Sequence, residues 1–165
     1  MSSSCLYQSP IGEIKLIEKN GYLIQAVFIE KYLRSDVNLE NFEQPTSMIL
    51  RKVCVEFDEY FLGNLQNFNL PLNPEGTSFQ LSAWKALLSI PYGETRSYLQ
   101  QSQFIKNPRA VRAIGRANSK NPIPIIIPCH RVIGKNGSLR GYAGGVDRKT
   151  HLLELEHSFM HVRKN

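Results

Sequence analysis

The stretch NPRAVRAIGRANSKNPIPIIIPCHRV, residues 107–132, is the most unusual part of this 165-residue chain. Its first half mixes arginines with alanines and a glycine, and its second half mixes prolines with isoleucines before a cysteine and a histidine. Asn107 and Pro108 predict the start of a helix, because Asn caps helices well and Pro suits their first position. We expect this helix to run to about Ser119. The prolines that follow predict a stiff, extended segment that holds Cys129 in a fixed place.

A second short helix is predicted just before this stretch, from Ser97 to about Gln103. Two short helices joined by a tight turn, the second rich in arginine, indicate a helix-turn-helix. We expect Val111 and Ile114 to face the core. The other positions of the second helix are mostly small residues, namely Ala110, Ala113, Gly115 and Ala117. A helix with such small side chains suits either close helix packing or entry into a groove with arginine side chains beside it. Composition does not decide between these two interpretations.

The residues before these helices predict a domain boundary. Thr77 or Ser78 is expected to cap a helix that carries Trp84 and ends before Pro91-Tyr92-Gly93. The segment Pro71–Gly76 is rich in turn formers and is the best linker in the chain. We therefore expect an N-terminal domain over residues 1–75 and a C-terminal domain over residues 76–165.

The first domain is predicted to combine strands with one helix. Glu13–Glu18 and Tyr22–Phe28 flank Asn20-Gly21, a strong hairpin signal, and Cys5–Gln8 adds a third strand. Ser47 is expected to cap an apolar-striped helix that Gly63 closes, with Cys54 as a plain core residue. Residues 31–46 are polar and predict a loop. Phe68 and Leu70 suggest a short last strand.

Composition and charge narrow the classes of function. Hydrophobic residues make up 42% and charged residues 21% of the chain, which is enough for a packed core. The formal net charge of +6 permits phosphate contacts. From residue 96 to residue 149 the only acidic residue is Asp147, against these basic ones: Arg96, Lys106, Arg109, Arg112, Arg116, Lys120, Arg131, Lys135, Arg140, Arg148 and Lys149. No apolar run is long enough to span a bilayer and no export signal is visible, so we expect a cytoplasmic protein with access to the nucleoid and no membrane contact.

The three cysteines, Cys5, Cys54 and Cys129, are odd in number and widely spaced. This pattern fits neither a disulfide framework nor a zinc site built from paired cysteines. The first domain offers no histidine beside Cys5 and Cys54, and we expect no metal. His151, His157 and His161 are expected to lie on the surface.

Cys129 beside His130 suggests a thiolate nucleophile, because the imidazole can take the thiol proton. In an extended segment, however, successive side chains point to opposite faces, so the two groups should not bond directly. A bridging water or a turn of the chain would meet this objection. A third group that orients His130 would strengthen the case for a nucleophile. The residues alone leave an inert buried thiol as the alternative.

Pro128-Cys129-His130-Arg131-Val132 resembles the active-site signature of the O6-alkylguanine-DNA alkyltransferases, also called methylated-DNA–protein-cysteine methyltransferases. The resemblance covers nearly all of residues 77–156 in the family's order and spacing. It includes Phe79-Gln80, Trp84, Ile90–Thr95, Ser97-Tyr98, Asn107–Gly115, Asn121–Ile127, Gly141–Gly145 and Leu152–Glu156. It implies an α/β protein with a small ribonuclease-H-like N-terminal domain and a mainly helical C-terminal domain that carries the helix-turn-helix.

The resemblance also implies catalytic roles. Cys129 would take the alkyl group from guanine O6, and His130 would reach its thiol through a water. Glu156 would hold His130, and Tyr98 would protonate or stabilise the departing guanine. Asn121 would tie the recognition helix to the active-site segment by hydrogen bonds.

DNA and base contacts are implied as well. The second helix would enter the minor groove of double-stranded DNA, with Arg112 filling the place of a flipped base. Close approach would involve the residues around it, namely Ala110, Ala113, Gly115 and Arg116. Base selection would involve Tyr142, Ala143, Val132 and Trp84. Many relatives have Ser where this chain has Ala143. The alanine removes one possible hydroxyl contact to guanine O6 and leaves the backbone amide.

The expected function is DNA repair by stoichiometric, irreversible alkyl transfer to Cys129, without a cofactor and by a monomer. The sequence leaves open whether O4-alkylthymine is also a substrate. Three alternatives remain. A damage-binding module of the alkyltransferase-like type lacks the cysteine, a thiol hydrolase would turn over, and a helix-turn-helix regulator would need no proline-mounted cysteine.

Overall fold

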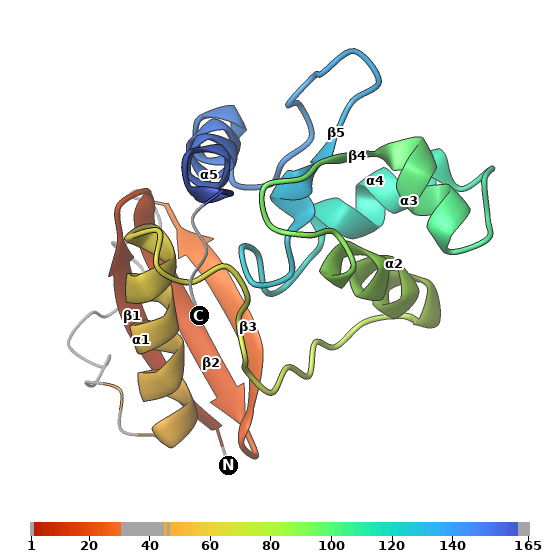
Figure 1. The fold of residues 1–165 in the computed structure, drawn as a ribbon. Helices are drawn as coiled ribbons and strands as arrows, with labels where there is room; N and C mark the ends of the chain where they lie inside the picture. Colours follow the sequence, from red (N-terminus) through yellow and green to blue (C-terminus); the bar gives the residue numbers. More distant parts are fainter. Residues whose placement is uncertain (1, 31–44, 46, 162–165) are drawn as a thin grey trace. The chain divides into compact units, whose positions relative to one another are not determined.

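The computed structural model describes residues 2–30, 45 and 47–161, which fall into two units, Met1–Pro74 and Glu75–Asn165 (Figure 1). The loop predicted for residues 31–46 lies outside the described residues apart from Pro45. Among the residues described, no helix is long and apolar enough to cross a membrane.

The first unit is built on an antiparallel sheet in the order β1 (Ser2–Ser9), β2 (Gly12–Lys19) and β3 (Tyr22–Ile29). Asn20 and Gly21 join β2 to β3 with φ of 54° and 84°. Positive φ at both central residues is what a tight hairpin turn requires, and Asn-Gly supplies it at little cost. The predicted hairpin and third strand are therefore confirmed.

Helix α1 (Met48–Phe61) packs along this sheet (Figure 1). Ser47 caps it as predicted, its hydroxyl accepting the amide of Leu50 at 3.0 Å. The helix buries Leu50, Val53, Phe57 and Tyr60, at helical spacing, toward the sheet.

The strand predicted at Phe68 and Leu70 is wrong. Leu72 instead makes an isolated bridge to Leu23, whose amide donates to the Pro71 carbonyl at 2.9 Å. The ring of Phe68 packs on the aromatic side chains of α1, 5.8 Å from Phe57 and 5.2 Å from Tyr60 between centroids. These ring contacts hold the segment against α1 without strand pairing at Phe68.

The second unit is mainly helical, with α2 (Ser78–Leu88), α3 (Tyr98–Phe104), α4 (Val111–Ser119) and α5 (Val146–Phe159). Two short parallel strands, β4 (Arg96–Ser97) and β5 (Val132–Ile133), pair beside them. Thr77 and Ser97 each form a capping box with the glutamine three residues later, which explains why both starts could be predicted.

Helices α3 and α4 form the predicted helix-turn-helix on top of α2. Ala83, Ile114 and Ala117 make its core. Gln101 and Asn118 exchange two hydrogen bonds of 2.9 and 2.8 Å across the helix pair, both side chains being buried. This paired amide contact fixes how α4 lies against α3.

The start predicted for α4 is wrong. The helix begins at Val111, its N-cap Ala110 offers no side-chain bond, and Asn107–Ala110 form a turn closed by the Ala110 amide on the Asn107 carbonyl at 3.0 Å. Asn at the first position and Pro at the second also suit a β-turn, and the structure has this turn in place of a helix start. Val111, expected in the core, is exposed, whereas Ile114 is buried as predicted.

The extended segment predicted before Cys129 is wrong as well. Residues 121–131 form consecutive turns: the Ile127 amide bonds the Ile123 carbonyl at 2.9 Å, and Cys129–Arg131 is a single 3-10 turn. Pro128, at φ −83° and ψ 65°, centres an inverse γ-turn that brings the Cys129 amide to the Ile127 carbonyl at 2.8 Å. A buried segment needs partners for its backbone groups, and these turns supply them within the segment.

Candidate active site

Cys129 lies at the start of the 3-10 turn and is 7% exposed. Its sulfur accepts a hydrogen bond of 3.2 Å from Asn121 Nδ2. Burial raises the pKa of the thiol to about 11, although Asn121 and the charge of Lys149 act in the opposite direction. A thiolate therefore forms here only if a nearby group takes the proton.

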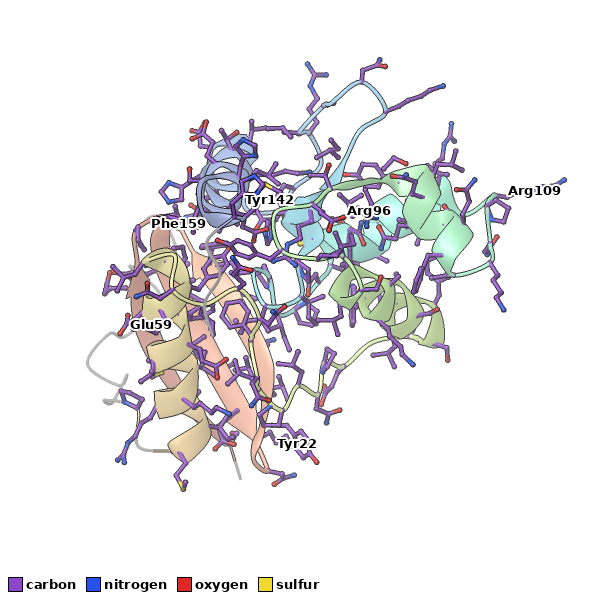
Figure 2. The ribbon with its side chains drawn as sticks, in the orientation of Figure 1. Tyr22, Glu59, Arg96, Arg109, Tyr142 and Phe159 are labelled. Atoms are coloured by element: carbon purple, nitrogen blue, oxygen red, sulfur yellow. The ribbon has the colours of Figure 1, made fainter. Side chains whose placement is uncertain are left out.

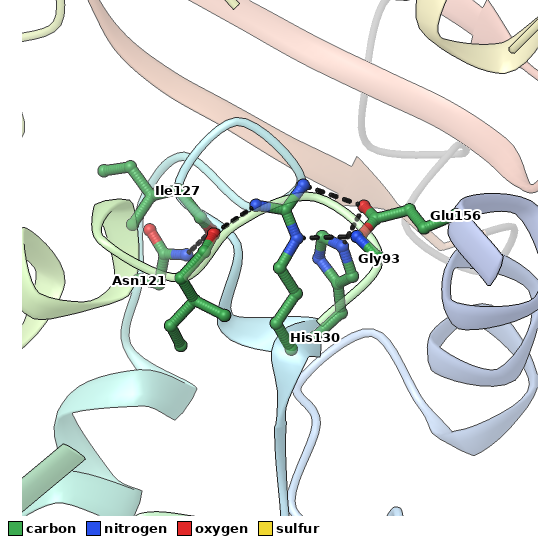
Figure 3. Close-up of polar contacts among 7 residues, drawn as sticks. Gly93, Asn121, Ile127, His130 and Glu156 are labelled. Carbon is green, nitrogen blue, oxygen red and sulfur yellow. Dashed lines mark hydrogen bonds and ion pairs between the residues drawn. The ribbon is translucent and has the colours of Figure 1, made fainter. Parts of the chain in front are cut away.

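His130 is fully buried and bonded through only one of its ring nitrogens. Its Nε2 lies 2.6 Å from Glu156 Oε2 (Figure 3), and its Nδ1 has no hydrogen-bond partner among the described residues. Because a carboxylate can only accept, Nε2 carries the proton and Nδ1 presents a lone pair. Burial outweighs the pull of Glu156 and lowers the pKa of His130, so the ring is neutral and able to take a proton.

Glu156, on α5, accepts bonds from three residues. Besides His130, Arg131 donates through Nε to Oε1 at 2.7 Å and through Nη2 to Oε2 at 3.1 Å. The Gly93 amide adds a contact of 3.3 Å to Oε1 (Figure 3). Burial raises the pKa of Glu156, but the charge and hydrogen bonds of His130 and Arg131 outweigh burial and hold it well below its usual range. Glu156 is therefore ionised, with the Arg131 guanidinium as its permanent counter-charge.

The turn after α2 closes around this ion pair. Arg131 Nη1 donates to the Ile90 carbonyl at 2.7 Å, and its guanidinium lies 5.7 Å from the centre of the Tyr92 ring. Gly93 has φ of 79°, and a Cβ there would lie 2.6 Å from Met160 Cβ. The chain thus has both a conformational and a steric reason for glycine at the position that donates to Glu156.

Lys149 is a second buried cation near Cys129. It is 1% exposed, and its ammonium donates to the Val132 carbonyl at 2.6 Å. Burial lowers the pKa of Lys149, while the Cys129 sulfur raises it. With Cys129 as a thiol and His130 neutral, Arg131, Lys149 and Glu156 leave an excess of positive charge in the protein interior. The positive charge of Lys149 favours the thiolate form of Cys129.

Asn121 connects α4 to the turns before Cys129. Its amide bonds the Asn118 carbonyl at 3.3 Å, and its side chain bonds the Ile127 carbonyl at 2.8 Å and the Ile123 amide at 3.0 Å. Ile125, between these contacts, is buried with φ of 74°. A β-branched residue in that region is strained, and such strain tends to occur at functional sites.

Two tyrosines lie within electrostatic range of Cys129. The Tyr98 hydroxyl makes only a long contact, 3.5 Å, to the Arg140 carbonyl. Burial, and then the charge of Cys129, raise the pKa of Tyr98. The Tyr142 ring is buried, its hydroxyl has no hydrogen-bond partner among the described residues, and its pKa is raised well above the usual value, first by burial. Ala143 next to it is exposed.

The remaining sequence-predicted residues fall into two groups. Val132 and Trp84 are buried and already bonded: the Val132 carbonyl accepts Lys149, and the Trp84 indole donates to the Ala117 carbonyl at 2.8 Å. The contacts of Trp84 are thus those of helix packing. On α4, Arg112, Ala113 and Arg116 are exposed, while Ala110 and Gly115 are half-buried.

Sequence reasoning missed Arg131 and Lys149 as parts of the site, since both were counted with the basic residues open to phosphate contacts. One signal for Lys149 was available. Lys149, Leu152 and Glu156 recur at helical spacing, and all three are buried on α5. Arg131 had no such signal, because its bonded partners lie far away in the sequence.

No group of metal-binding side chains accompanies this site. Within the described ranges, no three His, Cys, Asp or Glu residues lie close enough to hold a metal ion. His151, His157 and His161 are exposed, as predicted.

Comparison with known proteins agrees with this geometry. The 6-O-methylguanine DNA methyltransferase family matches through its ribonuclease-like domain over residues 4–74 and its DNA binding domain over residues 78–158. The methylated-DNA–protein-cysteine methyltransferase of Methanosarcina barkeri is 47% identical over 151 residues, 92% of this chain and 94% of that protein.

Solved structures give the same result. The Mycobacterium tuberculosis O6-methylguanine methyltransferase superposes with a TM-score of 0.86 at 41% identity, over 99% of this chain and 97% of that one. The Mycobacterium tuberculosis OGT in complex with DNA superposes with a TM-score of 0.84 at 42% identity, over 95% of this chain and 94% of that one. The predicted mixed α/β fold is confirmed, and the chain belongs to the 6-O-methylguanine DNA methyltransferase family.

Proposed function

We propose that this protein repairs alkylated DNA by transferring the alkyl group of O6-alkylguanine irreversibly to its own Cys129. Membership of the family supports the reaction. One observation supports assigning the reaction to Cys129: its buried thiol is followed directly by His130. Glu156 holds Nε2 of His130, and Nδ1 of His130 has no hydrogen-bond partner within the described part of the chain.

The proton of Cys129 must leave before or during attack. His130 Nδ1 is the acceptor we propose, reached through a water, because Cys129 and His130 have no direct side-chain bond among the contacts described. The sulfur then attacks the alkyl carbon, the carbon–O6 bond breaks, and guanine leaves with the electron pair. Glu156 stabilises the imidazolium that forms.

The leaving guanine needs a proton or a hydrogen bond. The Tyr98 hydroxyl, free of any short bond among the described residues, is suited to donate it. The Tyr142 hydroxyl and the exposed Ala143 backbone are suited to contact the base. The product is a thioether, which has no good leaving group, so each chain should act once.

Double-stranded DNA is the proposed partner, contacted through α4. Its exposed face combines Arg112 and Arg116 with the small Ala113, a profile that suits a narrow groove. Arg109, labelled in Figure 2, projects from the turn just before this helix. We expect a monomer that acts in the cytoplasm.

Stoichiometry tests this proposal most directly. Duplex DNA containing O6-methylguanine, in excess over protein, should replace one thiol hydrogen of each chain by a methyl group, a net mass gain of one CH2, and repair should stop when the protein is consumed. Intact-mass spectrometry and quantification of remaining O6-methylguanine measure the two quantities. Continued turnover would favour a hydrolase, and DNA binding without mass gain would favour a binding module.

Arg112→Ala separates DNA engagement from chemistry. We expect repair of O6-methylguanine in duplex DNA to slow by about tenfold or more, because unstacking the base costs roughly a few kcal/mol that Arg112 would offset. The reaction with free O6-benzylguanine should not change, since no base has to be flipped. Lys85→Ala, an exposed cation on α2, is the matched control. Equal losses on both substrates would contradict the role given to Arg112.

Lys149→Met tests the buried cation. Loss of the charge should raise the pKa of Cys129, so that alkyl transfer to free O6-benzylguanine slows at neutral pH and recovers as pH rises. A shift of about one pKa unit corresponds to roughly tenfold in the thiolate fraction. The pH–rate profile measures it, with Lys85→Met as control and thermal melting to check the fold. A rate reduced equally at every pH would mean that Lys149 acts only in packing.

A further inference from the structure

The first unit contains two thiols that the proposed reaction does not use. Cys5 lies on β1 and is fully buried, and Cys54 lies on α1 and is partly exposed. Both are free cysteines, and their side chains are hydrogen-bonded to each other. Their separation in the sequence gave no sign of this pairing.

Neighbouring contacts on the same two elements place the thiols together independently. The Tyr7 hydroxyl donates to Asp58 Oδ1 at 2.6 Å, and the Tyr7 ring lies 5.1 Å from that of Phe57. Cys5 precedes Tyr7 by two residues, which returns to the same face of a strand about 6.6 Å away. Cys54 precedes Asp58 by four residues, which returns to the same face of a helix about 6 Å away. The matched steps place both cysteines in the same part of the contact between β1 and α1.

We propose that Cys5 and Cys54 are a redox-active thiol pair that closes to a disulfide when the protein meets a low-molecular-weight disulfide such as oxidised glutathione. The sulfur of the partly exposed Cys54 attacks a glutathione sulfur and releases the first glutathione thiol. The Cys5 sulfur then attacks Cys54 and releases the second. Two electrons pass from the protein to the oxidant, and the two thiol protons end on the two glutathiones.

The electrostatics of the pair favour the anion on Cys5. The hydrogen bond from Cys54 lowers the pKa of Cys5 in spite of burial, which favours an anion on the sulfur that must close the bridge. The same bond, then burial and the negative charges of Cys5 and Asp58, raise the pKa of Cys54. Attack by Cys54 therefore requires that its proton first passes to the Cys5 sulfur.

The cross-link would stabilise the first unit. It joins β1 to α1 and closes a long loop that includes β2 and β3, and a long loop gives a large entropic restriction of the unfolded chain. We expect oxidation to raise the melting temperature of this unit by roughly 10 °C. Oxidation should leave Cys129 available, so alkyl acceptance and disulfide formation are separate measurements.

The test uses the full-length Cys129→Ser chain, in which only the pair carries thiols. After incubation with oxidised glutathione, intact mass should fall by two hydrogens, and peptide mapping should join Cys5 to Cys54. The added variant Cys5→Ser should instead keep a stable glutathione adduct on Cys54, and Cys54→Ser should leave the buried Cys5 unmodified. A stable adduct in the chain that retains both thiols, or no reaction of Cys54 while the chain is folded, would overturn the proposal. Melting of the reduced and oxidised forms gives a readout that requires no substitution at Cys5 or Cys54.

Discussion

Replacing Cys129 with serine is expected to abolish alkyl transfer while leaving the fold and DNA binding intact. A serine hydroxyl is far less acidic than a thiol and a weaker nucleophile toward saturated carbon, so His130 could not generate a useful anion from it. The Asn121 side chain, which now donates to the sulfur, can donate to the hydroxyl oxygen instead. The change therefore removes the acceptor atom and little else.

Intact mass after incubation with O6-methylguanine duplex measures this loss, and binding to the same duplex measures what is retained. Cys54→Ser is the matched control, because Cys54 is also a free thiol but lies in the first unit. The control should gain one methyl group per chain. Methylation of the Cys129→Ser chain would place the acceptor elsewhere and remove the basis of the mechanism.

Local signals in the sequence located most of the elements. Ser47, Thr77 and Ser97 each accept an amide three residues later, and Asn20-Gly21 forms the tight turn that its residue types favour. These features could be predicted because the interaction is made within a few residues. Asn107-Pro108 shows the limit of the same reasoning, because one dipeptide suits both a helix start and a β-turn. In the structure the dipeptide forms the β-turn, and α4 begins at Val111.

The candidate site was harder to predict where it depends on distant contacts. The resemblance around Cys129 and Glu156 predicted an acceptor, a histidine and a carboxylate, and the structure shows the histidine bonded to the carboxylate. A count of basic residues could not separate Arg131 and Lys149 from exposed arginines, because their burial depends on the carbonyls of Ile90 and Val132. The prolines before Cys129 led to the wrong expectation of an extended segment, because the buried amides need partners and consecutive turns supply them.

Glu156→Gln is expected to affect both stability and alkyl transfer. A glutamine has one acceptor oxygen in place of two, and its NH2 group would face the N–H groups of His130 or Arg131. Arg131 and Lys149 would then lie buried without a compensating anion, and removal of one partner of a buried ion pair costs about 3–5 kcal/mol. Losing the group that orients His130 should slow alkyl transfer by roughly 10²–10⁴-fold.

The effect of Glu156→Gln on the free energy of unfolding should depend on pH. The folded state holds the pKa of Glu156 well below its ordinary value of 4.5. Its contribution to stability is therefore complete above pH 4.5 and is lost as the pH falls toward the folded-state pKa. The difference in unfolding free energy between the wild-type chain and Glu156→Gln should be largest near neutral pH and shrink in acid.

Denaturant unfolding at several pH values measures the stability difference, and single-turnover transfer from O6-benzylguanine measures the rate. Glu154→Gln is the matched control, because Glu154 is an exposed carboxylate on the same helix and should change neither quantity. The effects on rate and on stability can be separated at neutral pH and low temperature. Under these conditions a destabilised chain remains folded, so slower alkyl transfer reports the loss of the group that orients His130. A Glu156→Gln chain that is destabilised but transfers at the wild-type rate would show that the carboxylate supports only the Arg131 ion pair. The proton of Cys129 would then leave by a route that does not need His130 to be oriented by Glu156.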